Sequence, residues 1–118
     1  MNKEAMKKRT NQFGLQAIRL CEALPDTPVA RVIRHQILRC VTSVGVNYRA
    51  ACHAKSKADF ISKMGTVEEE TDESMYLMEL IMDAVLLKEE LITDFYQGAD
   101  DLISTVVSSI QTAKRRIE

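Results

Sequence analysis

RCVTSVGVNYRAACHAKSKADFISKMGTVEEETDE, residues 39–73, is the stretch that decides the fold. Its first half is basic and apolar, and its second half is acidic. Apolar residues recur every three or four positions on both sides of Lys55, which is typical of amphipathic helices. Ser56, followed three residues later by Asp59, is a variant of an N-terminal capping box. The stretch therefore predicts two antiparallel helices joined near residue 55.

The same spacing continues through the chain and predicts helices over residues 3–24, 28–54, 57–86 and 88–116. Thr27 is placed as the N-cap of the second helix, because Pro28 suits the first helical position. The third and fourth helices are separated by no Gly or Pro. We expect a turn near residues 86–88, because one helix over both would be about 90 Å long.

These four helices predict an all-α, antiparallel up-down-up-down bundle that forms a single domain over residues 1–118. Composition agrees, since the chain is 46% hydrophobic and has only four Gly, two Pro and no Trp. Such a composition favours long helices over a turn-rich β fold.

The charges are unevenly distributed, although the net charge is only −1. Residues 1–57 contain 11 Lys and Arg against 3 Asp and Glu, whereas residues 58–113 contain 2 against 13. One interpretation is that oppositely charged helices pair within the bundle, and charge alone favours it. The other interpretation is that a basic face binds a polyanion.

The three cysteines, Cys21, Cys40 and Cys52, show no CxxC spacing, and no secretory signal precedes them. We therefore expect a reduced, cytoplasmic protein. No apolar run approaches the roughly 18 residues needed to cross a bilayer, so we expect no membrane partner.

Motifs of catalysis and metal binding are missing from the sequence. The residues three positions before His35 and His53 are Val32 and Ala50. The Glu-x-x-His motif of di-metal bundles is therefore absent. No Ser, Cys or Thr lies in a glycine-rich elbow or phosphate loop. We therefore predict no enzyme activity, no catalytic residues, no metal and no cofactor.

A polar layer is predicted where the two central helices face each other. Residues of an antiparallel pair joined near residue 55 meet when their numbers sum to about 111. This places Arg39, Ser43, Asn47 and Glu68 within or beside the core. We interpret them as fixing the register, because one unsatisfied buried polar group costs about 1–3 kcal/mol. A binding site is the less favoured interpretation.

The face of the second helix that points away from the core is unusually apolar. It carries Val32, Leu38, Val46 and Cys52. Such a patch predicts packing on a neighbouring subunit, and therefore a homo-oligomer.

Basic residues form a candidate surface for nucleic-acid phosphates. They are Arg49, His53, Lys55, Lys57, Arg31, Arg34, Lys7, Lys8 and Arg9, with Lys114, Arg115 and Arg116 at the end of the chain. Arg49, His53, Lys55 and Lys57 form the narrowest candidate set. Only Tyr48 offers an aromatic platform among them, so the pattern favours contact with the phosphate backbone over base recognition.

Four segments resemble one known family. They are LPDTPV at residues 24–29, RCVTSVGVNYRAAC at 39–52, SKADF at 56–60 and VEEETDES at 67–74. Together they resemble the bacterial four-helix-bundle family first met in 23S rRNA intervening sequences, over nearly the whole chain. Arg39, Ser43, Asn47, Glu68 and Glu73 fall at signature positions of that family.

The resemblance implies a homopentameric ring of four-helix subunits. It also implies kinship to accessory proteins of diversity-generating retroelements, which bind nucleic acid and partner a reverse transcriptase. No known reaction is implied. Two functions follow as expectations. One is a non-enzymatic, oligomeric accessory of RNA, DNA or a ribonucleoprotein, and the alternative is a structural protein–protein interaction module without a nucleic-acid role.

Overall fold

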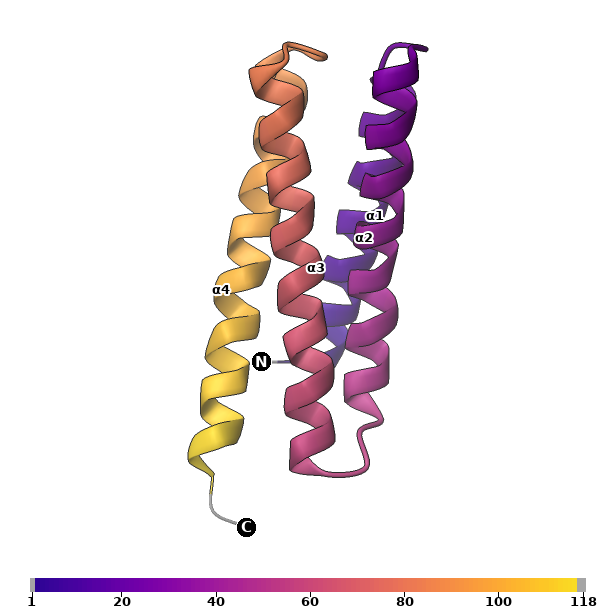
Figure 1. The fold of residues 1–118 in the computed structure, drawn as a ribbon. Helices are drawn as coiled ribbons and strands as arrows, with labels where there is room; N and C mark the ends of the chain where they lie inside the picture. Colours follow the sequence, from indigo (N-terminus) through magenta and orange to yellow (C-terminus); the bar gives the residue numbers. More distant parts are fainter. Residues whose placement is uncertain (1, 117–118) are drawn as a thin grey trace.

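The computed structural model describes residues 2–116, which form four helices and one short 3-10 helix without strands. The elements are α1 (Lys3–Ala23), α2 (Pro28–Cys52), α3 (Lys57–Asp83), η1 (Glu89–Leu91) and α4 (Thr93–Arg115). Consecutive helices run in opposite directions (Figure 1). The all-α prediction is confirmed, and the first two predicted helices end within two residues of the observed bounds.

Side-chain caps start α2 and α3 where the sequence predicts them. The Thr27 hydroxyl accepts a hydrogen bond from the Ala30 N–H (3.1 Å), and the Ser56 hydroxyl accepts one from the Asp59 N–H (3.0 Å). The Asp59 carboxylate in turn accepts from the Lys55 N–H (3.1 Å). This reciprocal pair satisfies backbone donors that the first turn of α3 would otherwise leave free.

The core follows the predicted spacing along α1, where Met6, Thr10, Phe13, Ala17, Leu20 and Leu24 are all buried. On α2 the core is wider near the end than the spacing predicts. Asn47 is half-buried, whereas Tyr48, which the spacing did not place in the core, is only 1% exposed. Both positions lie near the core because α2 packs on α1 and on α3 and so buries a wide arc.

The connection between α3 and α4 is longer than predicted. The third helix was expected to reach residue 86 and the fourth to start at residue 88, but α3 ends at Asp83 and α4 begins at Thr93. Val85, which continues the apolar spacing of α3, has a left-handed φ of 54° and is 80% exposed, so it lies outside the core.

Hydrogen bonds explain why α3 ends there. The Val85 N–H donates to the Met82 carbonyl (3.1 Å) and the Leu86 N–H donates to the Ile81 carbonyl (3.0 Å). This is the Schellman arrangement, in which the left-handed residue is usually glycine. Because valine occupies that position here, the sequence does not indicate that the helix ends.

The two outer helices contact each other least. α1 packs on α2 and α4 packs on α3, while α1 and α4 share few contacts. They meet where the rings of Phe13 and Phe95 lie 4.9 Å apart and where Arg9 donates to the Thr105 hydroxyl (3.2 Å). The bundle is an elongated body of 52 × 21 × 20 Å whose α1–α4 side is the least closed.

Replacing Val85 with glycine is expected to raise the free energy of unfolding by about 1 kcal/mol. A β-branched residue is strained at a positive φ, and glycine is not. The matched control is Glu69→Gly, in which an exposed residue inside α3 becomes glycine and the free energy falls by about 0.5 kcal/mol. Urea denaturation of both variants measures the pair, and a destabilised Val85→Gly protein would contradict the strain argument.

Candidate nucleic-acid interface

Three parts of the chain lie in the same half of the bundle, which we call the basic end, with the start of α1 set back from the α2–α3 connection (Figure 1). They are residues 2–8 at the start of α1, residues 49–59 around the α2–α3 connection and residues 112–116 at the end of α4. Their cations are Lys3, Lys7, Lys8, Arg49, Lys55, Lys57, Lys114, Arg115 and Arg116. Only two carboxylates, Glu4 and Asp59, lie in these segments, so the basic end carries a net charge of +7 in a chain of net charge −1.

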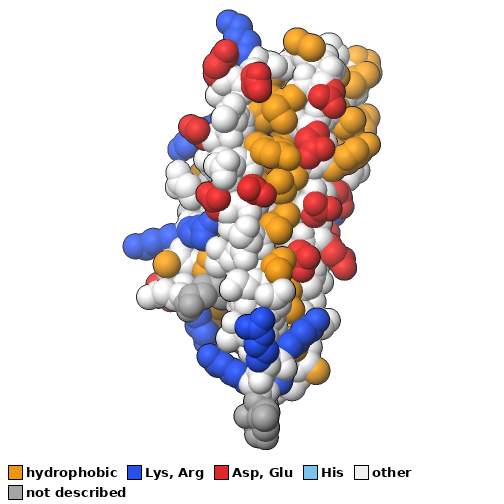
Figure 2. Space-filling model, turned by 90° about the vertical axis from the view of Figure 1, so that its left-hand side faces the viewer, with side chains coloured by type: hydrophobic (Ala, Val, Ile, Leu, Met, Phe, Trp, Pro, Cys, Tyr) orange, Lys and Arg blue, Asp and Glu red, His pale blue; other side chains and the backbone are white. Residues whose placement is uncertain are grey.

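Most of this positive charge is not neutralised locally. Of the nine cations, Lys7 alone forms an ion pair with a described carboxylate, that of Glu4 at 3.7 Å. Lys57 instead donates to the Arg116 carbonyl and so connects α3 to the end of α4. Figure 2 shows Lys and Arg side chains gathered at the lower end of the α4 side, with Asp and Glu along its upper part.

Asp59 is the carboxylate closest to the α2–α3 connection. Hydrogen bonding to the Lys63 ammonium, assisted by the Lys55 N–H, holds the pKa of Asp59 below its usual value. Asp59 therefore stays ionised, and its charge is directed to Lys63 and to the cap of α3.

Most of the predicted phosphate-binding residues lie at or beside the basic end. Lys8, Arg49, His53 and Lys55 are exposed, while Lys7, Lys57 and Arg9 are half-buried. The Arg9 guanidinium contacts the Thr105 hydroxyl, which fixes it between α1 and α4. Lys3 also belongs to this end, although the sequence did not single it out.

Arg31 and Arg34 are a correction, because the start of α2 places them at the opposite end of the bundle. Arg31 lies 3.7 Å from the Asp26 carboxylate. Arg34 donates to the carbonyls at the end of α1, namely those of Cys21 (3.2 Å), Leu24 (3.2 Å) and Pro25 (3.3 Å). Its charge stabilises a helix C-terminus instead of facing solvent.

Arg34→Ala is expected to lower the free energy of unfolding by about 1–2 kcal/mol, because three carbonyls lose a charged donor. Arg49→Ala removes an exposed arginine of the same helix and is expected to change it by less than about 0.5 kcal/mol. Thermal or urea unfolding compares the two. Equal effects would show that Arg34 has no capping role.

Tyr48 is a second correction. Its ring is buried, so it cannot serve as a stacking platform on the surface. Burial, and then the neighbouring Cys52 thiol, raise the pKa of Tyr48 above its usual value, so the phenol stays protonated. Apart from weak hydrogen bonding with that thiol, its oxygen has no hydrogen-bond partner among residues 2–116.

The predicted polar layer is not assembled as one unit. Asn47 donates to the Ser43 carbonyl and hydroxyl (both 2.9 Å), and this contact stays within α2. Arg39 lies at the surface, where it pairs with Glu73 and with Glu70 (3.2 Å) on α3, and Glu73 raises its pKa. Glu68 is half-buried and belongs to neither group.

The predicted pairing of the two central helices is nevertheless close to the observed one. The numbers of the paired residues on α2 and α3 sum to 109 and 112, near the expected 111. Among residues 2–116, the polar or charged residues that are buried are Thr10, Thr71 and Ser74. Each donates to a carbonyl of its own helix, so none of them needs a partner across the bundle.

A possible metal-ligand cluster accompanies Arg39. Atoms of Cys40, Glu70 and Glu73 lie within 4.8 Å of one another. Burial raises the pKa of Cys40 to about 12, which disfavours the thiolate that a metal requires. Arg39 already pairs with both carboxylates, so the geometry favours an ion pair over a metal site.

The predicted interface residues divide into two groups. Val32 and Val46 are 65% and 67% exposed. Leu38 and Cys52 are half-buried against the core, since the rotation of α2 turns them towards its neighbours. Other exposed apolar residues on α1 and α2 are Leu15, Ile18 and Val29, which the predicted patch did not include.

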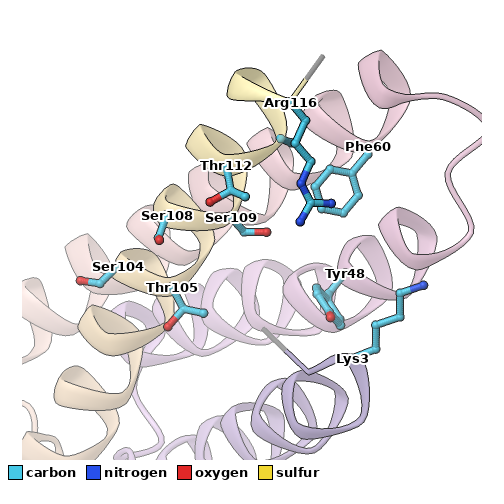
Figure 3. A pocket seen from close by; sticks show the side chains of 10 residues that line it. Lys3, Tyr48, Phe60, Ser104, Thr105, Ser108, Ser109, Thr112 and Arg116 are labelled. Carbon is cyan, nitrogen blue, oxygen red and sulfur yellow. The ribbon is translucent and has the colours of Figure 1, made fainter. Parts of the chain in front are cut away.

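A groove opens beside the basic end on the poorly closed side of the bundle, between the first turn of α1 and the last turns of α4 (Figure 3). Its volume is about 620 Å³. One wall is a row of hydroxyl side chains on α4, Ser104, Thr105, Ser108, Ser109 and Thr112. In the sequence this row is a repeat of Ser and Thr at helical spacing. A search for apolar core positions does not single it out, because the row lies beside the apolar seam of α4.

Comparisons with known proteins give a family match, similarity to solved structures and one negative result. Residues 2–108 match the model of a family described as 23S rRNA-intervening sequence protein. A solved structure, described as a protein with unknown function from the S23 ribosomal protein family of Bacteroides thetaiotaomicron, is 28% identical with a TM-score of 0.86. The alignment covers 94% of this chain and 99% of that one. Curated protein sequences gave no match.

Neither description names a catalytic activity. Within the described part of the chain, the search for spans found no helix with both the length and the apolar content to cross a bilayer.

Proposed function

The chain belongs to the 23S rRNA-intervening sequence protein family, and from this we propose that it is a non-enzymatic, homo-oligomeric accessory protein that binds nucleic-acid phosphates through its basic end. The observation that carries the proposal is the separation of charge. The basic end has a net charge of +7, so the rest of the chain carries −8. A concentrated cationic surface on an otherwise acidic molecule attracts a polyanion to one place and repels it elsewhere.

The cations are also available for phosphate contact. Most are exposed lysines and arginines at helix ends, and they come from separate segments, so several can reach one backbone at once. Contacts of this kind position a nucleic acid without reading its sequence. They release condensed counterions, which makes affinity strongly dependent on salt.

Assembly would multiply such contacts. The exposed Val32 and Val46, with Leu15, Ile18 and Val29, support an apolar subunit interface on α1 and α2. We propose a ring, pentameric as in the family resemblance, in which each subunit presents a copy of the basic end. Repeated weak contacts on one oligomer raise the total affinity for a long polyanion.

The same apolar surface favours the second candidate function. In that case the exposed residues of α1 and α2 dock another protein, such as a reverse transcriptase, and the basic end has no nucleic-acid role. Salt dependence separates the two functions, because apolar docking does not weaken as phosphate contacts do.

Charge reversal at the basic end is expected to weaken binding of structured RNA and duplex DNA by more than about tenfold at about 50 mM salt. The variant is Lys55→Glu with Lys114→Glu, two exposed residues at the basic end. The slope of log affinity against log salt should also become shallower by about two. Filter binding at about 50 and 200 mM salt measures both.

The matched control is Arg31→Glu with Lys88→Glu, which makes the same change in net charge with exposed residues at the other end. It is expected to stay within about threefold of the unmodified protein. Equal losses in both variants would assign the effect to overall charge. Absence of binding at low salt would favour the protein-docking function.

Val32→Glu with Val46→Glu is expected to dissociate the oligomer, because burying two carboxylates in an apolar interface is unfavourable. Light scattering compares it with Tyr76→Glu, which alters an exposed apolar side chain on α3. A mass of 13.3 kDa for the unmodified protein at micromolar concentration would contradict the proposed assembly.

A further inference from the structure

We propose that the groove between α1 and α4 binds one unpaired nucleotide, so that the protein selects single-stranded nucleic acid over duplex. This inference rests on the proposed function, because the basic end must first hold the phosphate backbone. The groove adds to that end a concave site whose lining differs in kind from the cationic surface around it.

The lining combines three types of group, each suited to one part of a nucleotide. Lys3 and Arg116 bring positive charge for a phosphate, and both are exposed. The hydroxyl row of α4 supplies short donors and acceptors for a sugar or a base edge. Phe60, half-buried on α3, supplies an aromatic surface for a base.

The strongest evidence is the Tyr48 hydroxyl. Tyr48 lines the same groove from α2, between the first turn of α1 and the hydroxyl row of α4 (Figure 3). Its side chain is 99% buried, yet its oxygen has no hydrogen-bond partner among the described residues other than the Cys52 thiol, which bonds weakly. Buried polar groups nearly always have a good partner, so a phenol that has only a weak one, which we call orphaned, points from the wall of the groove to a ligand's polar atom.

Size and access favour a single nucleotide. A volume of about 620 Å³ lies within the range of about 300–1,000 Å³ that small-molecule pockets occupy. A base inside a duplex is stacked and paired, and can enter such a site only after it is unstacked. Single strands need no such step, so the groove favours them.

Two substitutions test the groove by fluorescence anisotropy with labelled oligo(U), oligo(dT) and a duplex, each about 12 nucleotides long. Tyr48→Phe removes only the orphaned oxygen, and its stability should be equal or higher. It is expected to weaken single-strand binding roughly three- to tenfold, and to lower the ratio of single-strand to duplex affinity. Ser108→Leu, which fills the groove from an exposed position, should act in the same direction.

Each variant has a matched control. Tyr96→Phe removes a phenol oxygen that lies away from the groove and donates to Glu79 (2.8 Å). Thr42→Leu adds an apolar side chain at an exposed position of α2 outside the groove. Both controls should bind single strands as the unmodified protein does.

The outcomes distinguish failure of the groove proposal from failure of the proposed phosphate binding at the basic end. Single-strand preference that falls in Tyr48→Phe and Ser108→Leu, and not in the controls, supports the groove. Equal binding of single strands and duplex that neither substitution alters overturns the groove and leaves the basic end intact. If no nucleic acid binds at about 50 mM salt, both proposals fail.

Discussion

The packing of α2 against α3 is the constraint on which the rest of the molecule depends. These helices make the most extensive contact in the bundle, and Arg39 connects them through Glu70 and Glu73. α1 and α4 are then attached to opposite members of this central pair and touch each other only sparingly. Incomplete closure between the outer helices follows from that arrangement, and the groove forms where α1 has only begun.

The same topology determines where charge collects. An up-down-up-down order brings two helix N-termini and two helix C-termini to the basic end, so their backbone dipoles largely cancel. The positive potential there must come from side chains. It does so because the sequence places lysines and arginines in three segments that are remote along the chain and adjacent in space.

Periodicity predicted the helices well because burial of one apolar stripe per helix determines their existence. It predicted N-termini best where a side chain performs the capping, as Thr27 and Ser56 do. It failed at the end of α3, because that helix ends at a left-handed backbone conformation of Val85. Valine rarely adopts this conformation, so the sequence does not indicate it. An apolar spacing cannot report a positive φ that accompanies the helix-ending hydrogen bonds at an unfavourable residue.

The candidate site was predicted in part, because charge is visible in a sequence and contact partners are not. Lys55 and Arg49 look equivalent to Arg34 along the chain, yet Arg34 is directed to the carbonyls at the end of α1. The corrections at Arg34 and Tyr48 share a cause. Each depends on what the neighbouring helix presents to the side chain, which is a property of the packed molecule.

The buried polar side chains of this fold differ in whether the bundle itself supplies them with good hydrogen-bond partners. Thr10, Thr71 and Ser74 lie in the core and satisfy themselves on carbonyls of their own helices, so their presence costs little. Tyr48 is equally buried and has only the weakly bonding Cys52 thiol, so its oxygen costs up to about 1–3 kcal/mol that phenylalanine would avoid. Packing alone gives no reason for that oxygen. It borders the one side of the bundle that the outer helices leave open, where a ligand can supply the good partner that the described chain does not.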